Sequence, residues 1–295
     1  MKNAYVFPGQ ASQYPGMGKK IYDSNIKAKN YFELANEILN FKITELMFYG
    51  SEEDIKQTKV TQPAVFLHSV IQYLCLENYP SPSMVAGHSL GEFSALVASG
   101  VLKFEDALSL VLQRATAMQK ACEITPSTMA AVINLSEDVI EKTLAEIDEI
   151  VVAANYNCPG QIVISGSEKG IDIAAERLKN AGAKRVLKLQ VGGAFHSPLM
   201  MPAQLELEKA IDKISFSSAK CPIYQNFDAL PHIDADTIKE NLKNQLVNPV
   251  KWTVTIQNMR KDGVEKIYEL APGKVLSGLI SKIDNNIIVE SLENN

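Results

Sequence analysis

The sequence predicts an α/β fold in which a mostly parallel sheet carries an inserted small domain of ferredoxin-like type. Strand-like and helix-like segments alternate along most of the chain, which is typical of a parallel sheet with helices on both faces. One short strand leads through a Gly-x-Ser-x-Gly turn directly into a helix. After Pro126 the order changes to β-α-β-β-α-β, the order of a ferredoxin-like unit. We therefore expect a main domain over residues 1–125 and 192–295 and an inserted domain over residues 126–191.

The N-terminal part of the main domain is predicted from capping residues and from the spacing of apolar residues. Ser51–Asp54 resembles a capping box, Pro63 is typical of a first helical turn, and Gly100 suits a helix end. The elements expected here are strands at 5–7 and 84–86 and helices at 26–40, 63–77, 92–98 and 104–123.

The inserted domain and the remainder of the main domain follow from the same patterns. The inserted domain should contain strands at 129–135, 151–156, 161–165 and 185–191, with helices at 136–147 and 168–181. The chain then returns to the main sheet with strands at 222–226, 265–270 and 287–290.

The composition is that of an ordinary globular enzyme. The 295 residues are 46% hydrophobic and 21% charged, and the formal net charge of −5 disfavours binding to nucleic acid. No uninterrupted apolar stretch is long enough to span a bilayer, and the N-terminal residues predict a strand rather than a signal peptide. We expect neither a nucleic-acid partner nor a membrane partner.

The four cysteines predict a reducing environment. Cys75, Cys122, Cys158 and Cys221 form no Cys-x-x-Cys pair, and no histidine lies at metal-ligand spacing from them. Their scatter through apolar contexts indicates buried thiols. We therefore expect a cytoplasmic protein without a metal site.

Ser89 is the strongest candidate for a nucleophile. It lies at the centre of Gly87–Gly91 (G-H-S-L-G), between a short apolar strand and a helix. The glycines allow a tight turn, which exposes the serine hydroxyl above the positive end of the helix. The alternative is an ordinary turn serine between two glycines.

A serine hydroxyl needs a base to take its proton, and His196 is the candidate base. It follows a predicted strand within G-G-A-F-H-S-P, whose small residues allow close approach to another element. His68 lies within a helix, where a surface or satisfied core position is expected. His88 should point away from Ser89, and His232 should be solvated in a polar loop. The alternative for His196 is a loop histidine that caps the next helix.

The usual third member of a serine triad is missing from the sequence pattern. No Asp or Glu stands out in a strand-end loop between Ser89 and His196. A backbone carbonyl can orient the histidine as well geometrically, which leaves room for a Ser-His dyad.

Arg114 is the second unusual residue, because it falls on the apolar stripe of its predicted helix. The stripe consists of Ala107, Val111, Ala115, Met118 and Cys122. A buried guanidinium needs an anionic partner, which is an internal carboxylate or a substrate carboxylate held by two hydrogen bonds. A side chain that extends to solvent is the third possibility.

Two backbone amides are placed to form an oxyanion hole. Gln10, in the loop after the first strand, is one candidate, and Leu90, the residue after the serine, is the other. Taken alone, Gln10 is also consistent with a plain turn residue.

Taken together, these segments resemble the malonyl-CoA:acyl carrier protein transacylase family nearly end to end. The resemblance rests on several ordered motifs at family-like spacing. They are F-P-G-Q-A-S-Q at 7–13, T-Q-P-A at 61–64, G-H-S-L-G-E at 87–92, Arg114 with Met118 and Gln119, P-G-Q at 159–161 with S-G at 165–166, G-A-F-H-S at 193–197, Gln245 with N-P-V at 248–250 and Trp252, and P-G-K-V-L at 272–276.

The resemblance implies an α/β-hydrolase-like main domain and a role for each candidate residue. Ser89 would be the nucleophile and His196 the base, oriented by the backbone carbonyl of Gln245. The N–H groups of Gln10 and Leu90 would form the oxyanion hole. The other implied substrate contacts are Arg114, which would hold the free carboxylate of malonate, Phe195, which would fill the space of a C2 methyl group, and Met118, Gln62 and Asn157, which would line the site.

The implied reaction carries the malonyl group from malonyl-CoA to the serine and then to the phosphopantetheine thiol of acyl carrier protein. Carrier protein and CoA would bind transiently to a monomer that needs no cofactor and serves fatty acid biosynthesis. The alternatives are a trans-acting acyltransferase for a polyketide synthase and a serine thioesterase or esterase. A catalytically silent module that docks carrier protein is a further alternative.

Two positions depart from the family pattern, which usually has glycine where this chain has Ala11 and Ala115. Alanine does not readily adopt a strongly positive φ, so the loop after the first strand is expected to be slightly reshaped. Ala115 adds a methyl group beside Arg114, and neither change removes a reacting group.

Overall fold

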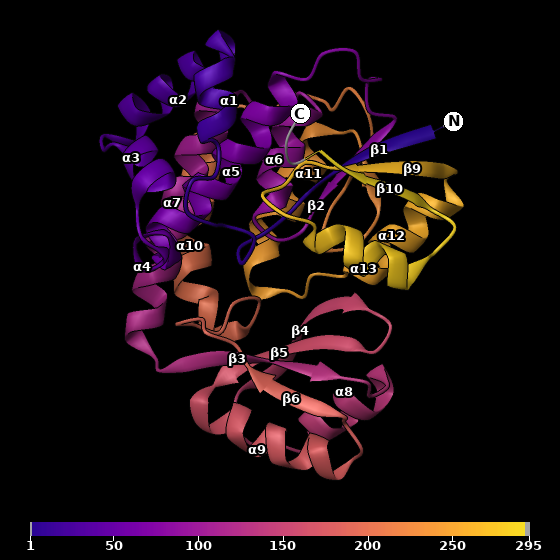
Figure 1. Ribbon diagram of the computed structural model, residues 1–295. Coiled ribbons are helices and arrows are strands. Elements are labelled where there is room, and N and C mark those ends of the chain that lie inside the picture. The colour runs from indigo at the N-terminus through magenta and orange to yellow at the C-terminus, as the bar shows by residue number, and fades with distance from the viewer. Residues whose placement is uncertain (1, 293–295) are drawn as a thin grey trace.

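The main sheet is six-stranded and mostly parallel, as the sequence predicts (Figure 1). The computed structural model describes residues 2–292. The strands run parallel in the order β10-β9-β1-β2-β7, and β8 is antiparallel to β7 at one edge. Their bounds are β1 (Lys2–Phe7), β2 (Met84–Gly87), β7 (Ile223–Tyr224), β8 (Pro231–His232), β9 (Val264–Glu269) and β10 (Ile288–Ser291).

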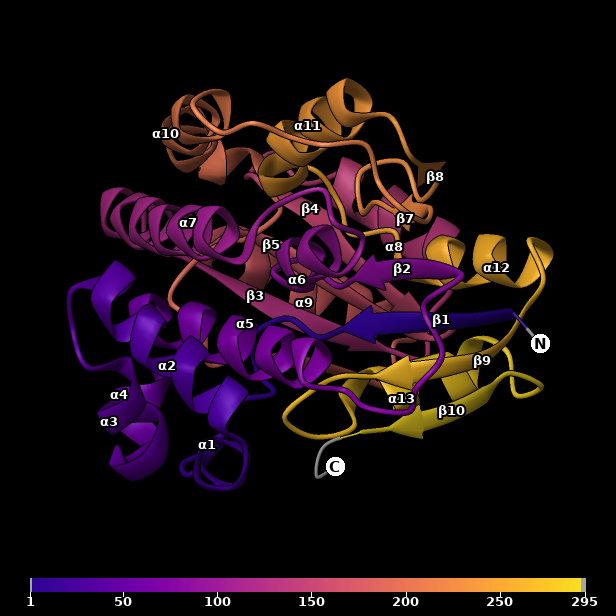
Figure 2. The same cartoon turned by 90° about the horizontal axis from the view of Figure 1, so that it is seen from above.

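Helices cover both faces of the main sheet, as Figure 2 shows from above. Because successive side chains of a strand point to opposite faces, Tyr5 and Phe7 enter the larger apolar core. Ala4 and Val6 enter the smaller core on the other side. The larger core is packed against α5 (Thr58–Leu74), α6 (Gly91–Ala98) and α7 (Phe104–Ile124), and the smaller against α12 (Trp252–Lys261) and α13 (Val275–Ile283).

The second sheet is antiparallel, with strand order β4-β5-β3-β6, and lies below the main sheet in Figure 1. Its strands are β3 (Ser127–Ile133), β4 (Val151–Cys158), β5 (Gln161–Ser167) and β6 (Arg185–Lys188), and α8 (Glu137–Ala145) and α9 (Glu168–Asn180) pack on it. The Tyr156 N–H donates to the Val250 carbonyl, and the Val250 N–H to the Ala154 carbonyl, at 2.9 Å each. This short bridge fixes the second sheet to the segment that leads into α12.

α5 begins earlier than predicted, at Thr58, so Pro63 lies inside the helix rather than in its first turn. The Gln57 carbonyl accepts hydrogen bonds from the Val60 and Thr61 N–H groups at 2.7 and 2.8 Å. The first turn therefore closes before the proline, which removes only one bond close to the helix start.

β6 and β7 are shorter than predicted, because the chain leaves each strand to build a site. β6 ends at Lys188, and residues 189–192 line a cavity instead of extending the sheet. β7 ends at Tyr224, and Gln225 and Asn226 turn into hydrogen bonds with α6.

The remaining helices are mostly short, and the sequence patterns located only some of them. The capping box at Ser51–Asp54 is confirmed and opens α4 (Glu52–Lys56), and α2 (Ile26–Leu39) lies where expected. The elements not predicted are α1 (Lys19–Ser24), α3 (Ile43–Tyr49), α10 (Met201–Asp212), α11 (Ala235–Asn244), α12, α13 and β8. No helix within residues 2–292 combines the length and the hydropathy needed to cross a membrane.

All four cysteines are free thiols, but only two are buried. Cys158 and Cys221 are buried as expected. Cys75 and Cys122 are half-buried, so the prediction is wrong for them, because they lie at the C-terminal ends of α5 and α7.

Candidate active site

Ser89 lies at the tip of the sharp turn between β2 and α6. Its φ of 52° is left-handed, a conformation that costs an L-residue about 1–2 kcal/mol. A Cβ on Gly87 would lie 1.9 Å from the Gly91 carbonyl carbon, and a Cβ on Gly91 would lie 2.0 Å from the Phe7 carbonyl oxygen. Only glycine lets the turn pack so closely on β1, and this packing presents the serine at the carboxyl edge of the parallel strands.

His196 faces the serine from the loop that follows the second sheet. Its Nε2 lies 2.7 Å from Ser89 Oγ, and its Nδ1 lies 3.1 Å from both the Gln245 and the Asn248 carbonyl oxygens. These two acceptors favour the tautomer with the proton on Nδ1, so that Nε2 is free to accept the serine proton. Within residues 2–292 no carboxylate accepts a hydrogen bond from this imidazole.

The protein keeps His196 neutral. Burial is the main cause and the positive charge of Arg114 the second, and together they lower the pKa of His196 to about 3. A neutral imidazole at neutral pH is the form that acts as a base.

Arg114 is fully buried in α7 and points at the serine. Its Nη2 donates to Ser89 Oγ at 3.0 Å, and its Nη1 donates to Gln62 Oε1 at 2.7 Å. Gln62 in turn donates from Nε2 to Met118 Sδ at 3.3 Å. Gln62 therefore holds the guanidinium and Met118 holds Gln62, whereas neither is among the residues that line the cavity, where the resemblance places them.

No internal carboxylate neutralises Arg114. Among residues 2–292 no Asp or Glu lies within ion-pair distance of it, and its buried Nε has no hydrogen-bond partner. Burial lowers the pKa of Arg114 to about 10, against the charge of Glu92, so the group stays positive at neutral pH. An internal salt bridge, one of the alternatives, is absent from the described structure.

A cavity lies beside Ser89 and His196, and residues from around the main sheet and from the second sheet line it. From the main domain it is lined by Gln10, Ser89 and His196, with Phe195 next to the histidine. From the second sheet it is lined by Met129 of β3 and Asn155 of β4. The second sheet thus supplies a wall of the site.

Asn157, expected to line the site, instead supports a neighbour of the nucleophile. Its Oδ1 lies 2.9 Å from His88 Nε2. The His88 ring also packs edge-on against Trp252, with the ring centroids 5.6 Å apart. His88 therefore points away from the serine hydroxyl, as the sequence analysis expects of neighbours in a sharp turn.

The two amides proposed for an oxyanion hole are not used by the fold. Within the described chain, neither the Gln10 N–H nor the Leu90 N–H donates to another protein group. Leu90 is the N-cap residue of α6, and Gln10 lines the cavity. Ala11, next to Gln10, has a φ of 75°, so the loop does hold the positive φ that alanine was expected to avoid.

Two side chains around Ser89 were missed by sequence reasoning. Asn226 Oδ1 accepts from the Ser89 N–H, and Asn226 Nδ2 donates to the Gly87 carbonyl, at 2.6 Å each. The Gln245 side chain, for which only a main-chain role was expected, donates from Nε2 to the Ser89 carbonyl at 3.0 Å. Its Oε1 lies 3.5 Å from Arg114 Nη2.

The two remaining histidines lie outside the site. His68 is buried with an unpartnered Nδ1, and burial lowers its pKa to about 4, so it is not a satisfied core residue. His232 is half-buried and its Nε2 lies 2.7 Å from Asp228 Oδ2, so the expectation of a solvated side chain is wrong. No group of side chains suited to a metal ion occurs among residues 2–292.

The arrangement suits transfer of an acyl group through serine. His196 can take the Ser89 proton and return it to a leaving group, while two unengaged amides can donate to the carbonyl oxygen. The unpaired guanidinium of Arg114 suits a substrate that carries an anion close to the reacting carbon.

Comparison with known proteins finds relatives over nearly the whole chain. Residues 4–284 match the family described as acyl transferase domain. A malonyl CoA-acyl carrier protein transacylase of Bacillus subtilis is 40% identical over 97% of this chain and 92% of its own length. One from Staphylococcus aureus is 40% identical over 99% of this chain and 96% of its own length.

Solved structures are similar over the full length as well. The malonyl CoA-acyl carrier protein transacylase of Coxiella burnetii superposes with a TM-score of 0.96 at 37% identity, covering 100% of this chain and 94% of that one. A malonyl-transacylase in complex with a type II PKS acyl-carrier protein superposes with a TM-score of 0.97 at 35% identity, covering 100% and 97%.

Proposed function

Because the chain belongs to the acyl transferase domain family, we propose that it transfers the malonyl group from malonyl-CoA to the phosphopantetheine thiol of acyl carrier protein. Relatives that bear the malonyl transacylase name align with nearly all of this chain, which supports the same substrates here.

In this proposal the reaction has two halves that share one machinery. Ser89 attacks the thioester carbonyl while His196, oriented by the Gln245 carbonyl, takes its proton. The Gln10 and Leu90 N–H groups hold the oxyanion, and His196 then protonates the departing CoA sulfur. The carrier thiol next gives its proton to His196 and attacks the malonyl-serine ester. The Ser89 oxygen leaves and takes that proton back from His196, which regenerates the free enzyme.

The observation that carries the proposal is the buried guanidinium beside the nucleophile. Arg114 Nη2 lies 3.0 Å from Ser89 Oγ and has no carboxylate partner among residues 2–292. A malonyl group brings a carboxylate to this position, whereas an acyl group without an anion leaves the charge unpaired. This favours a malonyl transacylase over an esterase or thioesterase for uncharged acyl groups.

The other candidate residues would act around this centre. We assign Gln62 and Met118 to the orientation of Arg114, through the hydrogen bonds at 2.7 and 3.3 Å. Phe195, which lines the cavity, would limit the size of the acyl group, and Asn157 would hold His88.

Mass spectrometry of the acyl-enzyme tests the proposal. Incubation with malonyl-CoA should add one malonyl group to Ser89, and holo-acyl carrier protein should then remove it as malonyl carrier protein. The Ser89→Ala variant should form no adduct while keeping the wild-type circular dichroism. Rapid release of free malonate without carrier protein would identify a thioesterase, and no adduct on the wild type would identify a silent docking module.

We further propose the fold type of each domain, the oligomeric state, the cellular location and the pathway. The β4-β5-β3-β6 order supports a ferredoxin-like unit over residues 126–191, within an α/β-hydrolase-like domain formed by 1–125 and 192–295. The enzyme would act as a monomer in the cytoplasm, without metal or cofactor, in fatty acid biosynthesis. One similar structure holds a polyketide carrier protein, so carrier proteins of both pathways belong in the transfer assay.

A further inference from the structure

Glu92 is a fully buried carboxylate three residues after the nucleophile. All residues of α6 are buried, and Glu92 is the one charged residue in that helix. The charge of Arg114 acts on Glu92, but no Lys, Arg or His within residues 2–292 forms a direct ion pair with it. Its oxygens instead accept hydrogen bonds, from the Asn226 N–H at 2.8 Å and from Gln225 Nε2 at 3.1 Å. A carboxylate is costly to bury without a directly paired cation, so its presence needs a reason beyond packing.

The reason lies in what Asn226 does with its side chain. Its amide bridges the turn, with Oδ1 2.6 Å from the Ser89 nitrogen and Nδ2 2.6 Å from the Gly87 carbonyl oxygen. The left-handed backbone of Ser89 is disfavoured by itself and needs such restraint. Asn226 is thus the link between Glu92 and the nucleophile.

We propose that Glu92 is a positioning residue, which acts through Asn226 to hold the Ser89 backbone where its hydroxyl meets His196. The inference rests on the proposed function only in taking Ser89 as the nucleophile. The 2.7 Å contact between Ser89 Oγ and His196 Nε2 depends on this backbone conformation.

The hydrogen-bond pattern requires a carboxylate rather than an amide at position 92. Gln225 Oε1 accepts from Asn241 Nδ2 at 3.2 Å, so the Gln225 NH₂ group must face Glu92. The Asn226 backbone can only donate. Both groups therefore donate to position 92, and the Gln245 side chain is a further hydrogen-bond partner of Glu92. Only an ionised carboxylate offers an unprotonated oxygen to every donor. Burial raises the pKa of Glu92 to about 7, and the donors oppose that rise.

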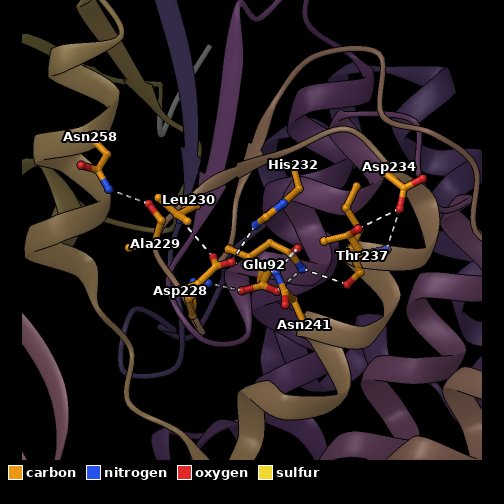
Figure 3. Close-up of polar contacts among 12 residues, drawn as sticks. Glu92, Asp228, Ala229, Leu230, His232, Asp234, Thr237, Asn241 and Asn258 are labelled. Atoms are coloured by element: carbon orange, nitrogen blue, oxygen red, sulfur yellow. Dashed lines mark hydrogen bonds and ion pairs between the residues drawn. The ribbon is translucent and has the colours of Figure 1, made fainter.

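A half-buried pair, Asp228 and His232, anchors the far side of the same network, as Figure 3 shows. Asn241 Nδ2 also donates to Asp228 Oδ2 at 3.2 Å, and His232 Nε2 lies 2.7 Å from that same oxygen. Gln225 Nε2 donates in addition to the Ile238 carbonyl at 3.0 Å. These contacts fix the Gln225 amide and leave Glu92 no alternative arrangement of donors.

The test compares Glu92→Gln with a matched variant at another buried carboxylate. Glu269 is also fully buried and accepts from the Leu276 and Ser277 N–H groups at 2.8 Å each, but at the start of α13. Glu269→Gln therefore controls for loss of a buried charge away from the turn. The readouts are the rate at which a fluorophosphonate labels Ser89, kcat and KM for malonyl-CoA, and the thermal midpoint.

We expect Glu92→Gln to lower the labelling rate and kcat about tenfold to a hundredfold, as expected for a nucleophile displaced by a fraction of an ångström. KM for malonyl-CoA should change by less than about threefold, because the cavity itself is untouched. In Glu269→Gln, the rate at which Ser89 is labelled should stay within about twofold of wild type, even if the thermal midpoint falls as far as in Glu92→Gln.

A second variant covers the case in which Glu92→Gln does not fold. Asn226→Asp keeps the acceptor for the Ser89 N–H but turns an oxygen toward the Gly87 carbonyl, and should lower labelling similarly. Labelling by every folded variant within about twofold of wild type overturns the inference. Because the phosphonate does not resemble malonyl-CoA, a wild type that labels but transfers no malonyl group refutes the proposed function and leaves this inference standing.

Discussion

The turn that carries Ser89 and the arginine that faces it are neighbours with opposite hydrogen-bond states. The Ser89 N–H donates to Asn226 at 2.6 Å, and its carbonyl accepts from Gln245 at 3.0 Å. Arg114 is fully buried, yet its Nε has no partner and no carboxylate pairs with it among residues 2–292. The serine turn therefore has its hydrogen bonds without a ligand, whereas the neighbouring guanidinium keeps one N–H without a partner and its charge without a counter-ion. In the proposed mechanism, the fold alone makes Ser89 reactive, and Arg114 makes the choice of acyl group depend on the substrate carboxylate.

Among the variants that keep Ser89, His196→Ala should have the largest effect, because it removes the base while leaving the serine turn intact. General-base assistance contributes about 10²–10⁴-fold, so acylation by malonyl-CoA should fall by that factor at neutral pH. Stopped-flow or quench-flow measurement of the acylation burst checks it. A near-normal burst in a correctly folded variant would remove His196 from the mechanism.

Arg114→Ala should come next and should act on selectivity. Hydrogen bonds to charged groups contribute about 1.5–3 kcal/mol, so kcat/KM for malonyl-CoA should fall about tenfold to a hundredfold. The ratio of kcat/KM for malonyl-CoA to that for acetyl-CoA should fall, because the acetyl group has no carboxylate that Arg114 could bind. An unchanged ratio would make Arg114 a structural residue only.

Binding of free malonate tests the role of Arg114 as an anion site without any turnover. A saturating ligand at about 100 times its Kd stabilises the folded state by about 2.7 kcal/mol, seen as a raised Tm. The wild type and Ser89→Ala should show this rise, and Arg114→Ala should not. A rise in all three proteins would place the anion site away from Arg114.

The pH dependence of Ser89 labelling should report on Glu92 rather than on His196. Burial raises the pKa of Glu92 to about 7, whereas burial and the Arg114 charge lower that of His196 to about 3. As pH falls through about 7, Glu92 takes up a proton on one of its two oxygens. That oxygen then no longer accepts equally well from the Asn226 N–H or from Gln225 Nε2, so the labelling of Ser89 should slow several-fold. Two further charges act on Glu92: that of Asp228 favours this protonation, and that of Arg114 opposes it.

The control for that profile is Glu92→Gln, which cannot titrate. Its labelling rate should be low and nearly flat across the same range. An acid limb that persists unchanged in Glu92→Gln would assign the titration to another group.

Gln245→Ala should have a moderate effect, because the main-chain carbonyl that orients His196 remains. The lost side-chain bond to the Ser89 carbonyl is a neutral one, worth about 0.5–1.5 kcal/mol, or roughly twofold to tenfold in kcat/KM. A triad carboxylate would cost about 10⁴-fold. A loss of that larger size would show that the Gln245 side chain, not its carbonyl, orients the base.

Sequence patterns singled out Ser89 and His196, which the structure brings within 2.7 Å of each other, because both residues lie in short, local motifs. The turn around Ser89 and the small residues before His196 carry their geometry in adjacent positions. Asn226 is 137 positions from Ser89 along the chain, so no local pattern links them. Glu92 was detectable, because it is the single charged residue of the apolar run that forms α6. A charged residue in such a run could have been predicted from the sequence to be buried and to need partners.

The fold was predictable to a similar degree and for similar reasons. Alternation of strands and helices was sufficient for a mostly parallel sheet, because a helix between two strands returns the chain so that the strands run in the same direction. The order β10-β9-β1-β2-β7-β8 is not the order along the chain, so the pairing itself was not predictable in this way. Short helices such as α1 and α3 contain too few residues for a clear apolar period. The early ends of β6 and β7 are set by contacts with the site, which only the folded chain brings together.

Ala11→Gly should have the smallest effect, and it tests how the loop beside Gln10 is held. Ala11 is exposed with a φ of 75°, which costs alanine about 1 kcal/mol that glycine does not lose. Glycine also gains freedom in the unfolded chain, so the net gain in unfolding free energy should stay below about 1 kcal/mol. Urea denaturation measures it, with Ala229→Gly, at φ 63° outside the cavity lining, as a comparison. Ala229 is fully buried, so its glycine variant also loses the contacts of a core methyl group and should gain less. The malonyl burst of both variants should stay within about twofold of wild type, since the amide of Gln10 keeps its place. A faster burst in Ala11→Gly alone would show that the alanine distorts the oxyanion hole.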